Sequence, residues 1–271
     1  MKTSQKDMFY TIFWIGLALL FNLYIYFAQG SVAATNFLTA YLVEKSLSVD
    51  NLFVFLLIFK AFHITSQHQH KILHWGILGA IVMRIIFIFA GLALIQRFTW
   101  LFYIFGAFLI YAGYKLLWQK EEETHPERNP IILMLEKWIP VTHSMESGKF
   151  IHQGMMTPLF LALISIESSD LVFALDSIPA VIGITTDPFI VISSNLFAIL
   201  GLRSLYFVLE SKISAFKYLH YGLSCILLFI GAKMFAHDWI HIQPLVSLFV
   251  ILTILALSLL PSLFIRKKDN S

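Results

Sequence analysis

The chain has 271 residues, of which 58% are hydrophobic and 13% are charged, and its mean hydropathy is +0.78. A soluble domain carries roughly 25% charged residues, so this composition excludes an ordinary soluble fold. The net charge of +3 is too small for a nucleic-acid-binding surface, and the single cysteine, Cys225, excludes an internal disulfide framework.

Eight apolar stretches are long enough to cross a bilayer, which takes about 20 residues of helix. In chain order they are 9–28, 37–59, 73–95, 100–118, 155–182, 188–209, 218–235 and 245–263. Eight such segments cannot all be buried in one soluble core of this size. The sequence therefore predicts an all-α fold, a polytopic transmembrane helical bundle of about eight spans that forms a single domain over 1–271.

Lysine and arginine residues are unevenly placed between these spans. With the N-terminus inside, thirteen of the nineteen lie in predicted cytoplasmic segments, five lie within spans, and only Arg97 lies in an outer loop. This asymmetry predicts that both termini are cytoplasmic. The first span, 9–28, follows Lys2 and Lys6 and is interpreted as a retained signal-anchor helix.

Rare charges recur in the same order in the two halves of the chain. Six positions separate the two acids of each half, and an arginine and then a Gly-x-Lys motif follow in the next two spans. The matched residues are Glu44 with Asp170, Asp50-Asn51 with Asp176-Ser177, Arg84 with Arg203, and 113–115 with 231–233. Chance rarely places intramembrane charges in such register.

Each copy of this repeat holds three spans, an odd number. The second copy, 155–235, must therefore cross the membrane in the opposite sense to the first, 37–118, which gives an inverted 3+3 repeat flanked by one span at each end. Residues 119–154 are expected to form a cytoplasmic linker, with a short interfacial helix at 131–139. The pair Asp187-Pro188 predicts the start of a helix.

Five acidic residues lie within the predicted spans, where an ionisable group is costly and is a functional-site hypothesis by default. Serine and asparagine accompany them, and carboxylate, hydroxyl and amide oxygens suit Mg²⁺, Ca²⁺ or Mn²⁺. The predicted metal ligands are Asp50, Asp176, Glu44, Asp170, Asn51 and Ser177, with Asp50 and Asp176 as the primary pair. Purely structural ion pairs between helices are the alternative interpretation.

Helix geometry limits this prediction. Residues six apart do not share a helix face, whereas Glu44 and Asn51 do, as do Glu167 and Asp170. One ion held by both acids of one copy would need a broken helix, for which Pro179 is the candidate. A site shared between the two copies is simpler. The two arginines either neutralise the acids when no ion is bound or pair helices permanently.

The motifs around these charges resemble those of the TerC family, which includes the Alx proteins. The resemblance spans 35–261 and is carried by 44–55, 169–180, 185–191 and 194–203. It implies a bacterial inner-membrane protein, with manganese export associated with Alx-like members and tellurite resistance with others. The family's acidic motif residues fall on Glu44, Asp50, Asp170 and Asp176, and its polar ones on Asn51, Ser177 and Asn195.

The expected function is therefore export of a divalent cation, most of all Mn²⁺, with exchange for protons as an extension. The two repeats would rock around the ion, and Glu167, Asn195, Arg84 and Arg203 would support it or supply counter-charge. No enzymatic activity and no cofactor besides the transported cation are expected. The expected partners are the lipid bilayer and the ion, self-association is left open, and nucleic acid is not expected.

Two other functions are weighed against transport. A non-transporting membrane scaffold would need the acids for folding but not for ion movement. An intramembrane aspartyl protease would use Asp50 and Asp176 as a dyad that shares a proton. Neither aspartate follows the Gly-x-Gly expected of such proteases, which disfavours the enzyme.

Overall fold

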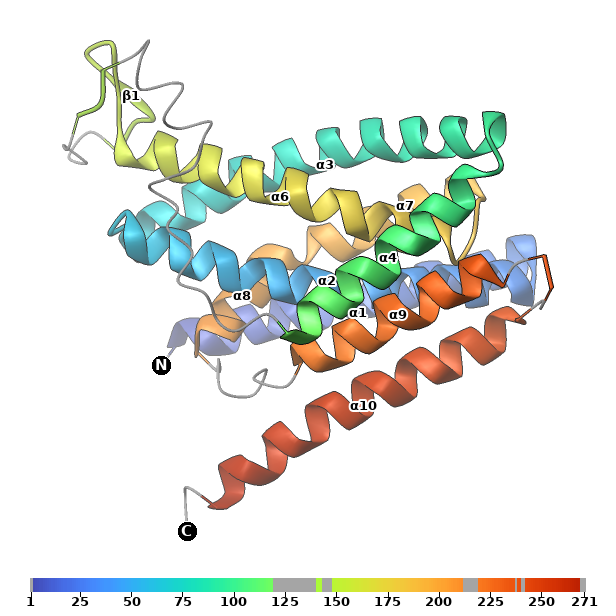
Figure 1. Ribbon diagram of the computed structural model, residues 1–271. Helices are drawn as coiled ribbons and strands as arrows, with labels where there is room; N and C mark the ends of the chain where they lie inside the picture. The colour runs from blue at the N-terminus through green and yellow to red at the C-terminus, as the bar shows by residue number, and fades with distance from the viewer. Residues whose placement is uncertain are drawn as a thin grey trace.

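The computed structural model describes residues 2–118, 140–142, 148–211, 219–236, 238–239 and 242–268. The side chains of 2–4, 50, 211 and 259–268 lie outside this description. The described chain is a bundle of long helices with one small sheet at one end of the bundle (Figure 1). The predicted class, a helical bundle, is confirmed.

The helices follow one another along the chain with short connections. They are α1 (Lys2–Gln29), α2 (Ser31–Ala61), α3 (Ser66–Arg97), α4 (Leu101–Trp118), α6 (Pro158–Ile182), α7 (Pro188–Leu200), α8 (Leu202–Ser211), α9 (Leu219–Phe235) and α10 (Pro244–Lys268). Successive helices run in alternating directions, with α8 continuing the path of α7 (Figure 1). The start of α1 and the end of α10 therefore point to the same end of the bundle.

Helix α2 lies at the centre of the helix packing, since it contacts α1, α6, α7 and α10. Helix α3 packs on α6 and α7, and α4 packs along α9. The pairs α2–α7, α3–α6 and α4–α9 each join one predicted copy of the repeat to the other. A two-fold axis between oppositely oriented copies would exchange the first two of these pairs and map the third onto itself, and the repeat itself stays a prediction.

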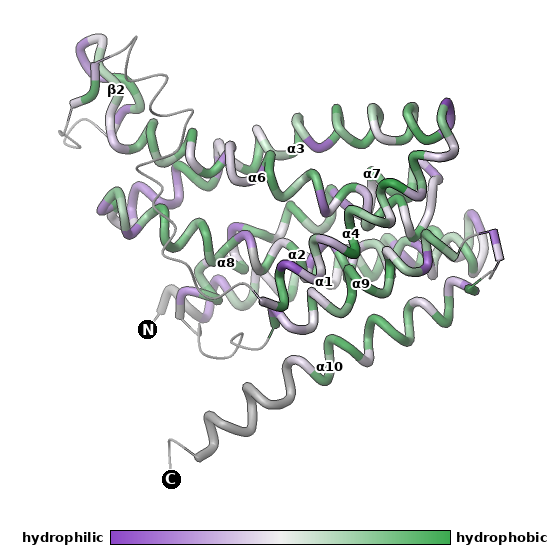
Figure 2. The backbone as a smooth tube through the Cα atoms, in the orientation of Figure 1, coloured by the Kyte–Doolittle hydropathy of each residue, from purple (hydrophilic) through white to green (hydrophobic). Residues whose placement is uncertain are grey.

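Four helices, α1, α3, α4 and α6, are long and apolar enough to cross a bilayer, and α7 with α8 would make a fifth span bent by 43°. Among the residues whose side chains are described, α9 and the Pro244–Ser258 part of α10 are apolar but shorter. Hydrophobic residues cover most of the coloured length of the helices, and hydrophilic ones lie near helix ends, in the small sheet and at scattered points along the helices (Figure 2). The chain is a polytopic membrane protein, and the count of eight spans stays a prediction.

Two details of the predicted spans are wrong. The span expected from 155 begins later, because residues 151–156 form a hairpin and α6 starts at Pro158. The break expected at Pro179 is absent, because α6 continues through it to Ile182. Proline removes one backbone hydrogen bond and crowds the carbonyl four residues earlier, yet α6 continues past Pro179 to its end. The break lies instead at Gly201, between α7 and α8.

The segment before α6 is tied to the start of α3. Strands β1 (Ile151–His152) and β2 (Met155–Met156) pair through a tight turn with positive φ at Gln153 and Gly154. Lys71 Nζ of α3 donates to Gly148 O at 2.8 Å and lies over the Phe150 ring. The predicted helix at 131–139 and most of the predicted linker lie outside the described residues.

The predicted helix start at Asp187-Pro188 is confirmed. Asp187 Oδ1 accepts hydrogen bonds from the backbone N–H groups of Phe189 (2.8 Å) and Ile190 (3.4 Å), and Pro188 occupies the first helical position. We expect Asp187→Ala to lower the free energy of unfolding by about 1 kcal/mol, because these donors lose their cap. Thermal unfolding in detergent measures this. Asp187→Asn, which keeps the acceptor oxygen, should lose much less.

Candidate functional site

One arginine joins two acidic residues near the middle of the bundle. Arg84 of α3 forms ion pairs with Glu44 of α2 and Asp170 of α6, with Nη2 3.1 Å from Asp170 Oδ1. Its Nε donates to Asp170 Oδ2 at 3.4 Å, so the guanidinium contacts both oxygens of that carboxylate. Its Nη1 donates to Asn195 Oδ1 of α7 at 3.1 Å. We call these four residues the central cluster.

The central cluster is removed from solvent. Glu44 is 0% exposed, Arg84 1%, Asn195 2% and Asp170 3%. Each residue comes from a different helix, and the pairs α2–α7 and α3–α6 bring the four together. The interaction therefore links both halves of the chain through groups that water does not screen.

The charges of the central cluster do not balance. With all three groups ionised, two carboxylates face one guanidinium, which leaves one negative charge in excess. Burying each ion costs several kcal/mol, and the attraction offsets this cost only when the geometry is good. Arginine suits the position because its planar fork contacts two oxygens at once. A buried site with surplus negative charge favours a cation.

A row of polar groups extends from the central cluster along α2 and α6. Glu44, Ser48 and Asn51 share one face of α2, since they are spaced by four and three residues, and all three are buried. Asp170 and Ser177 share a buried face of α6 in the same way. Helices α2 and α6 run in opposite directions (Figure 1). The two polar faces therefore extend toward opposite ends of the bundle.

Several of these buried polar atoms have no hydrogen-bond partner among the described residues. They are Glu44 Oε2, Ser48 Oγ, Ser177 Oγ and Asn195 Nδ2. Each such group costs about 1–3 kcal/mol when it stays unpaired. Native proteins usually satisfy such atoms with water or an ion. Three of the four are oxygen atoms, the ligands that hard divalent cations prefer.

Arg203 is the predicted site residue that the structure places elsewhere. Its side chain is exposed on α8, and its Nη2 lies 3.3 Å from Nδ1 of His70. The break at Gly201 separates it from α7, and the α7 residue that reaches Arg84 is Asn195. The prediction that Arg203 neutralises the buried acids is therefore wrong. A second guanidinium in the cluster would also repel Arg84.

The other predicted acids differ in position. The Asp50 side chain lies outside the described part of the chain, although α2 is continuous through this position. Asp176 is half-buried on α6. Glu167, also half-buried, lies against α3, where a methyl group added at Gly79 would meet its carboxylate. The acids that the structure brings together across the two halves are thus Glu44 and Asp170, and the Asp50–Asp176 pair stays a prediction.

No three histidine, cysteine or acidic side chains converge to form a resident metal site within the described residues. The central cluster supplies two carboxylates, one of which is also bound through two guanidinium nitrogens. A cation that binds there must first displace the Arg84 side chain. The arrangement therefore fits a cation that binds transiently rather than one held permanently.

Comparison with known proteins identifies the family. A family model described as "Integral membrane protein TerC family" matches residues 29–270. The chain belongs to the TerC family. Its relatives include the "Uncharacterized membrane protein STKORF319" of Myxococcus xanthus, which is 46% identical over 263 residues, or 96% of this chain and 82% of the relative.

Two further relatives carry a more informative name. The "Putative membrane-bound redox modulator Alx" of Salmonella typhi is 45% identical over 273 residues, which cover 96% of this chain and 85% of the relative. The protein of the same name from Escherichia coli K12 is 42% identical over 280 residues, or 99% and 87%. No solved structure matches this TerC-family chain.

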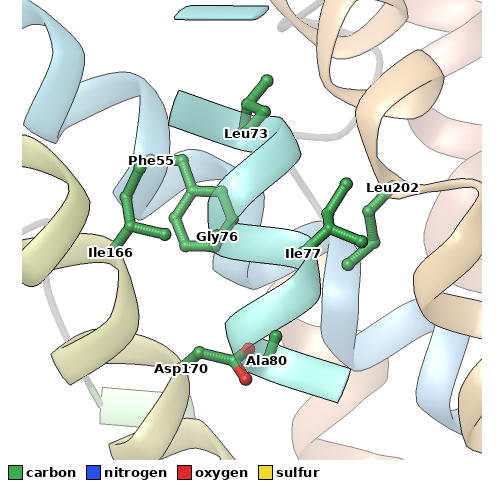
Figure 3. A pocket seen from close by; sticks show the side chains of 8 residues that line it. All are labelled: Phe55, Leu73, Gly76, Ile77, Ala80, Ile166, Asp170 and Leu202. Carbon is green, nitrogen blue, oxygen red and sulfur yellow. The ribbon is translucent and has the colours of Figure 1, made fainter. Parts of the chain in front are cut away.

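Two features of this TerC-family protein were missed at the sequence level. Lys45, next to Glu44, donates from Nζ to the backbone oxygen of Ala198 at 3.0 Å, near the end of α7. A narrow pocket also reaches Asp170 (Figure 3). It is lined by Phe55, Leu73, Gly76, Ile77, Ala80, Ile166, Asp170 and Leu202. The charge of Lys45 within a predicted span could have pointed to its contact with α7. A pocket with an apolar lining leaves no comparable pattern in the sequence.

Proposed function

We propose that this chain exports a divalent metal cation from the bacterial cytoplasm across the inner membrane, with Mn²⁺ as the main substrate. The central cluster is the observation that carries the proposal. It joins carboxyl groups from both halves of the chain, has two acidic residues against one basic residue, and borders buried oxygens without partners among the described residues. A wider role of this protein in manganese homeostasis or tellurite resistance is proposed from the family resemblance.

Arg84 plays the part of a built-in counter-ion in this proposal. In the empty protein its guanidinium neutralises much of the charge of Glu44 and Asp170, so that the empty carrier can change conformation. An arriving cation takes over both carboxylates and releases the guanidinium. Asn51 and Ser177, on the two polar faces, supply further oxygens on either side of the cluster. Carboxylates freed of metal can take up protons, which provides exchange for protons.

The proposal predicts that Glu44→Gln and Asp170→Asn abolish Mn²⁺ flux. Each variant keeps the side chain's shape but removes a charged oxygen ligand. Mn²⁺ entry into inverted membrane vesicles, followed with a metal-quenched dye inside, measures the flux. Glu210→Gln and Asp238→Asn are matched controls, because they make the same chemical changes at exposed positions. Flux that persists unchanged in both cluster variants would remove the proposed ligands.

A scaffold without transport is the second candidate, and the same cluster favours it. Arg84 already contacts both acids, so the network joins four helices without any ion. A scaffold predicts that cells with and without the protein contain equal Mn²⁺. Thiol–disulfide exchange within one chain needs two cysteines and the sequence has one, so a redox role like that in the relatives' name would not use an internal disulfide of this chain.

A further inference from the structure

The pocket beside Asp170 lies on one side of the central cluster. Phe55 follows Glu44 along α2, whereas Leu73 and Ile166 precede the cluster residues of α3 and α6. Because α2 runs opposite to α3 and α6, all of these residues lie toward the end of the bundle that carries the small sheet (Figure 1). The predicted orientation, with Lys60, Lys71 and Lys149 inside, makes this the cytoplasmic end.

We propose that this pocket is the cytoplasmic entrance to Asp170, and that Lys45 holds it closed by fixing the break between α7 and α8. The identity of the ion that enters rests on the proposed function. The entrance and its closure rest on the geometry of the pocket and the break. Asp170 is the one ionisable side chain among the eight lining residues, so it marks the inner end of the path.

The pocket is closed by apolar side chains. Phe55, Leu73, Ile166 and Leu202 are 2–6% exposed, and the space between them holds about one water molecule. Figure 3 shows Leu202 beside Ile77 on one side of the pocket and Phe55 with Ile166 on the other. A hydrated cation cannot pass such a tightly packed apolar lining, so one wall must move before an ion reaches Asp170.

Leu202 is the wall residue best placed to move. It is the first residue of α8, directly after the break at Gly201, where the helix axis bends by 43°. The other lining residues lie inside the long helices α2, α3 and α6. A change of the bend at Gly201 therefore shifts Leu202 while the opposite wall stays in place.

Lys45 fixes this bend from α2. Its ammonium donates to Ala198 O, a carbonyl in the last turn of α7, where a positive charge also meets the negative end of the helix dipole. Gly201 permits the close approach, because an added methyl group would lie 2.8 Å from Lys45 Nζ and 3.2 Å from Trp14 Cβ. Glu44 and Lys45 are adjacent, so one turn of α2 contacts both the central cluster and the break.

The test measures how fast a water-soluble reagent reaches the pocket. The parent is Cys225→Ser with Ala80→Cys, which places a single thiol in the lining, and the reagent is a charged methanethiosulfonate applied to vesicles and followed by mass spectrometry. Labelling of the parent should be slow. Lys45→Met should raise the rate about tenfold, the scale expected when a charged hydrogen bond is lost. Leu202→Ala should also raise the rate, because it removes part of the apolar wall. Lys45→Arg, which keeps a donor and a charge, should restore slow labelling.

A second thiol separates opening of the pocket from general loosening. Ala180 of α6 is buried and does not line the pocket, so Ala180→Cys in the same background should stay slow in all variants. The proposal is overturned if Lys45→Met leaves the Ala80→Cys rate unchanged, or if it speeds both thiols alike. Labelling does not depend on transport. If the protein showed no Mn²⁺ flux but the two thiols were labelled as expected, the proposed function would be refuted. The proposed entrance and its closure by Lys45 would still be supported.

Discussion

Replacing Arg84 with glutamine is expected to cost about 3–5 kcal/mol of folding free energy, the typical loss when one partner of a buried ion pair is removed. The change leaves Glu44 and Asp170 charged, buried and without a counter-ion. It also takes a donor from Asn195. Thermal unfolding of the purified protein in detergent, with the yield of monodisperse material, measures the loss.

A charge-neutral triple variant tests the cause. Glu44→Gln, Arg84→Gln and Asp170→Asn together keep similar side-chain volumes and leave no ion in the central cluster. Most of the stability lost in Arg84→Gln should return, because neutral amides can hydrogen-bond to one another. Arg203→Gln is the matched control at an exposed position and should change little. A triple variant as unstable as Arg84→Gln would show that packing, rather than unpaired charge, causes the loss.

Replacing Gly231 with valine is expected to cost about 3 kcal/mol, the upper part of the usual range for overpacking. A Cβ at this position would lie 2.7 Å from the backbone oxygen of Gly106 and 3.0 Å from the backbone nitrogen of Ile110. Backbone atoms cannot rotate aside as a side chain can. Helices α4 and α9 must therefore separate, and the contact along both helices is lost. Thermal unfolding in detergent measures the effect.

Gly16 of α1 is the matched control for this substitution. It is also a helical glycine, but an added Cβ would meet nothing within 4 Å. Gly16→Val changes the same backbone preference without a clash, so its stability should stay within about 0.5 kcal/mol of the parent. Equal losses in the two variants would contradict a backbone contact between α4 and α9 as the cause.

Much of this structure follows from patterns that a membrane imposes on sequence. Long apolar runs predicted the helices, and Asp187-Pro188 predicted the start of α7. Intramembrane charges drew attention to Glu44, Arg84 and Asp170, because an unpaired charge in that environment is too costly to keep. These signals are local or depend on burial alone, and a single sequence contains them.

The remaining features depend on contacts that sequence spacing does not encode. Matched spacing suggested that Arg203 is equivalent to Arg84, but the helix breaks before Arg203 and directs it to His70. Proline was the obvious candidate for the break, yet the break lies at Gly201, where an added side chain would displace Lys45 Nζ and press on Trp14 of α1. The neighbours that favour glycine at this position lie far away along the chain.

The glycine contact between α4 and α9 also restricts how the two halves of the chain can move relative to each other. Gly106 and Gly231 touch through their backbones, with Ile110 and Met234 close beside them. Sliding one helix along the other would drive these larger side chains into the space that now admits only glycine. Rotation about the contact avoids that collision. The α4–α9 seam is therefore suited to act as a pivot, with larger displacements confined to the helices that surround Arg84.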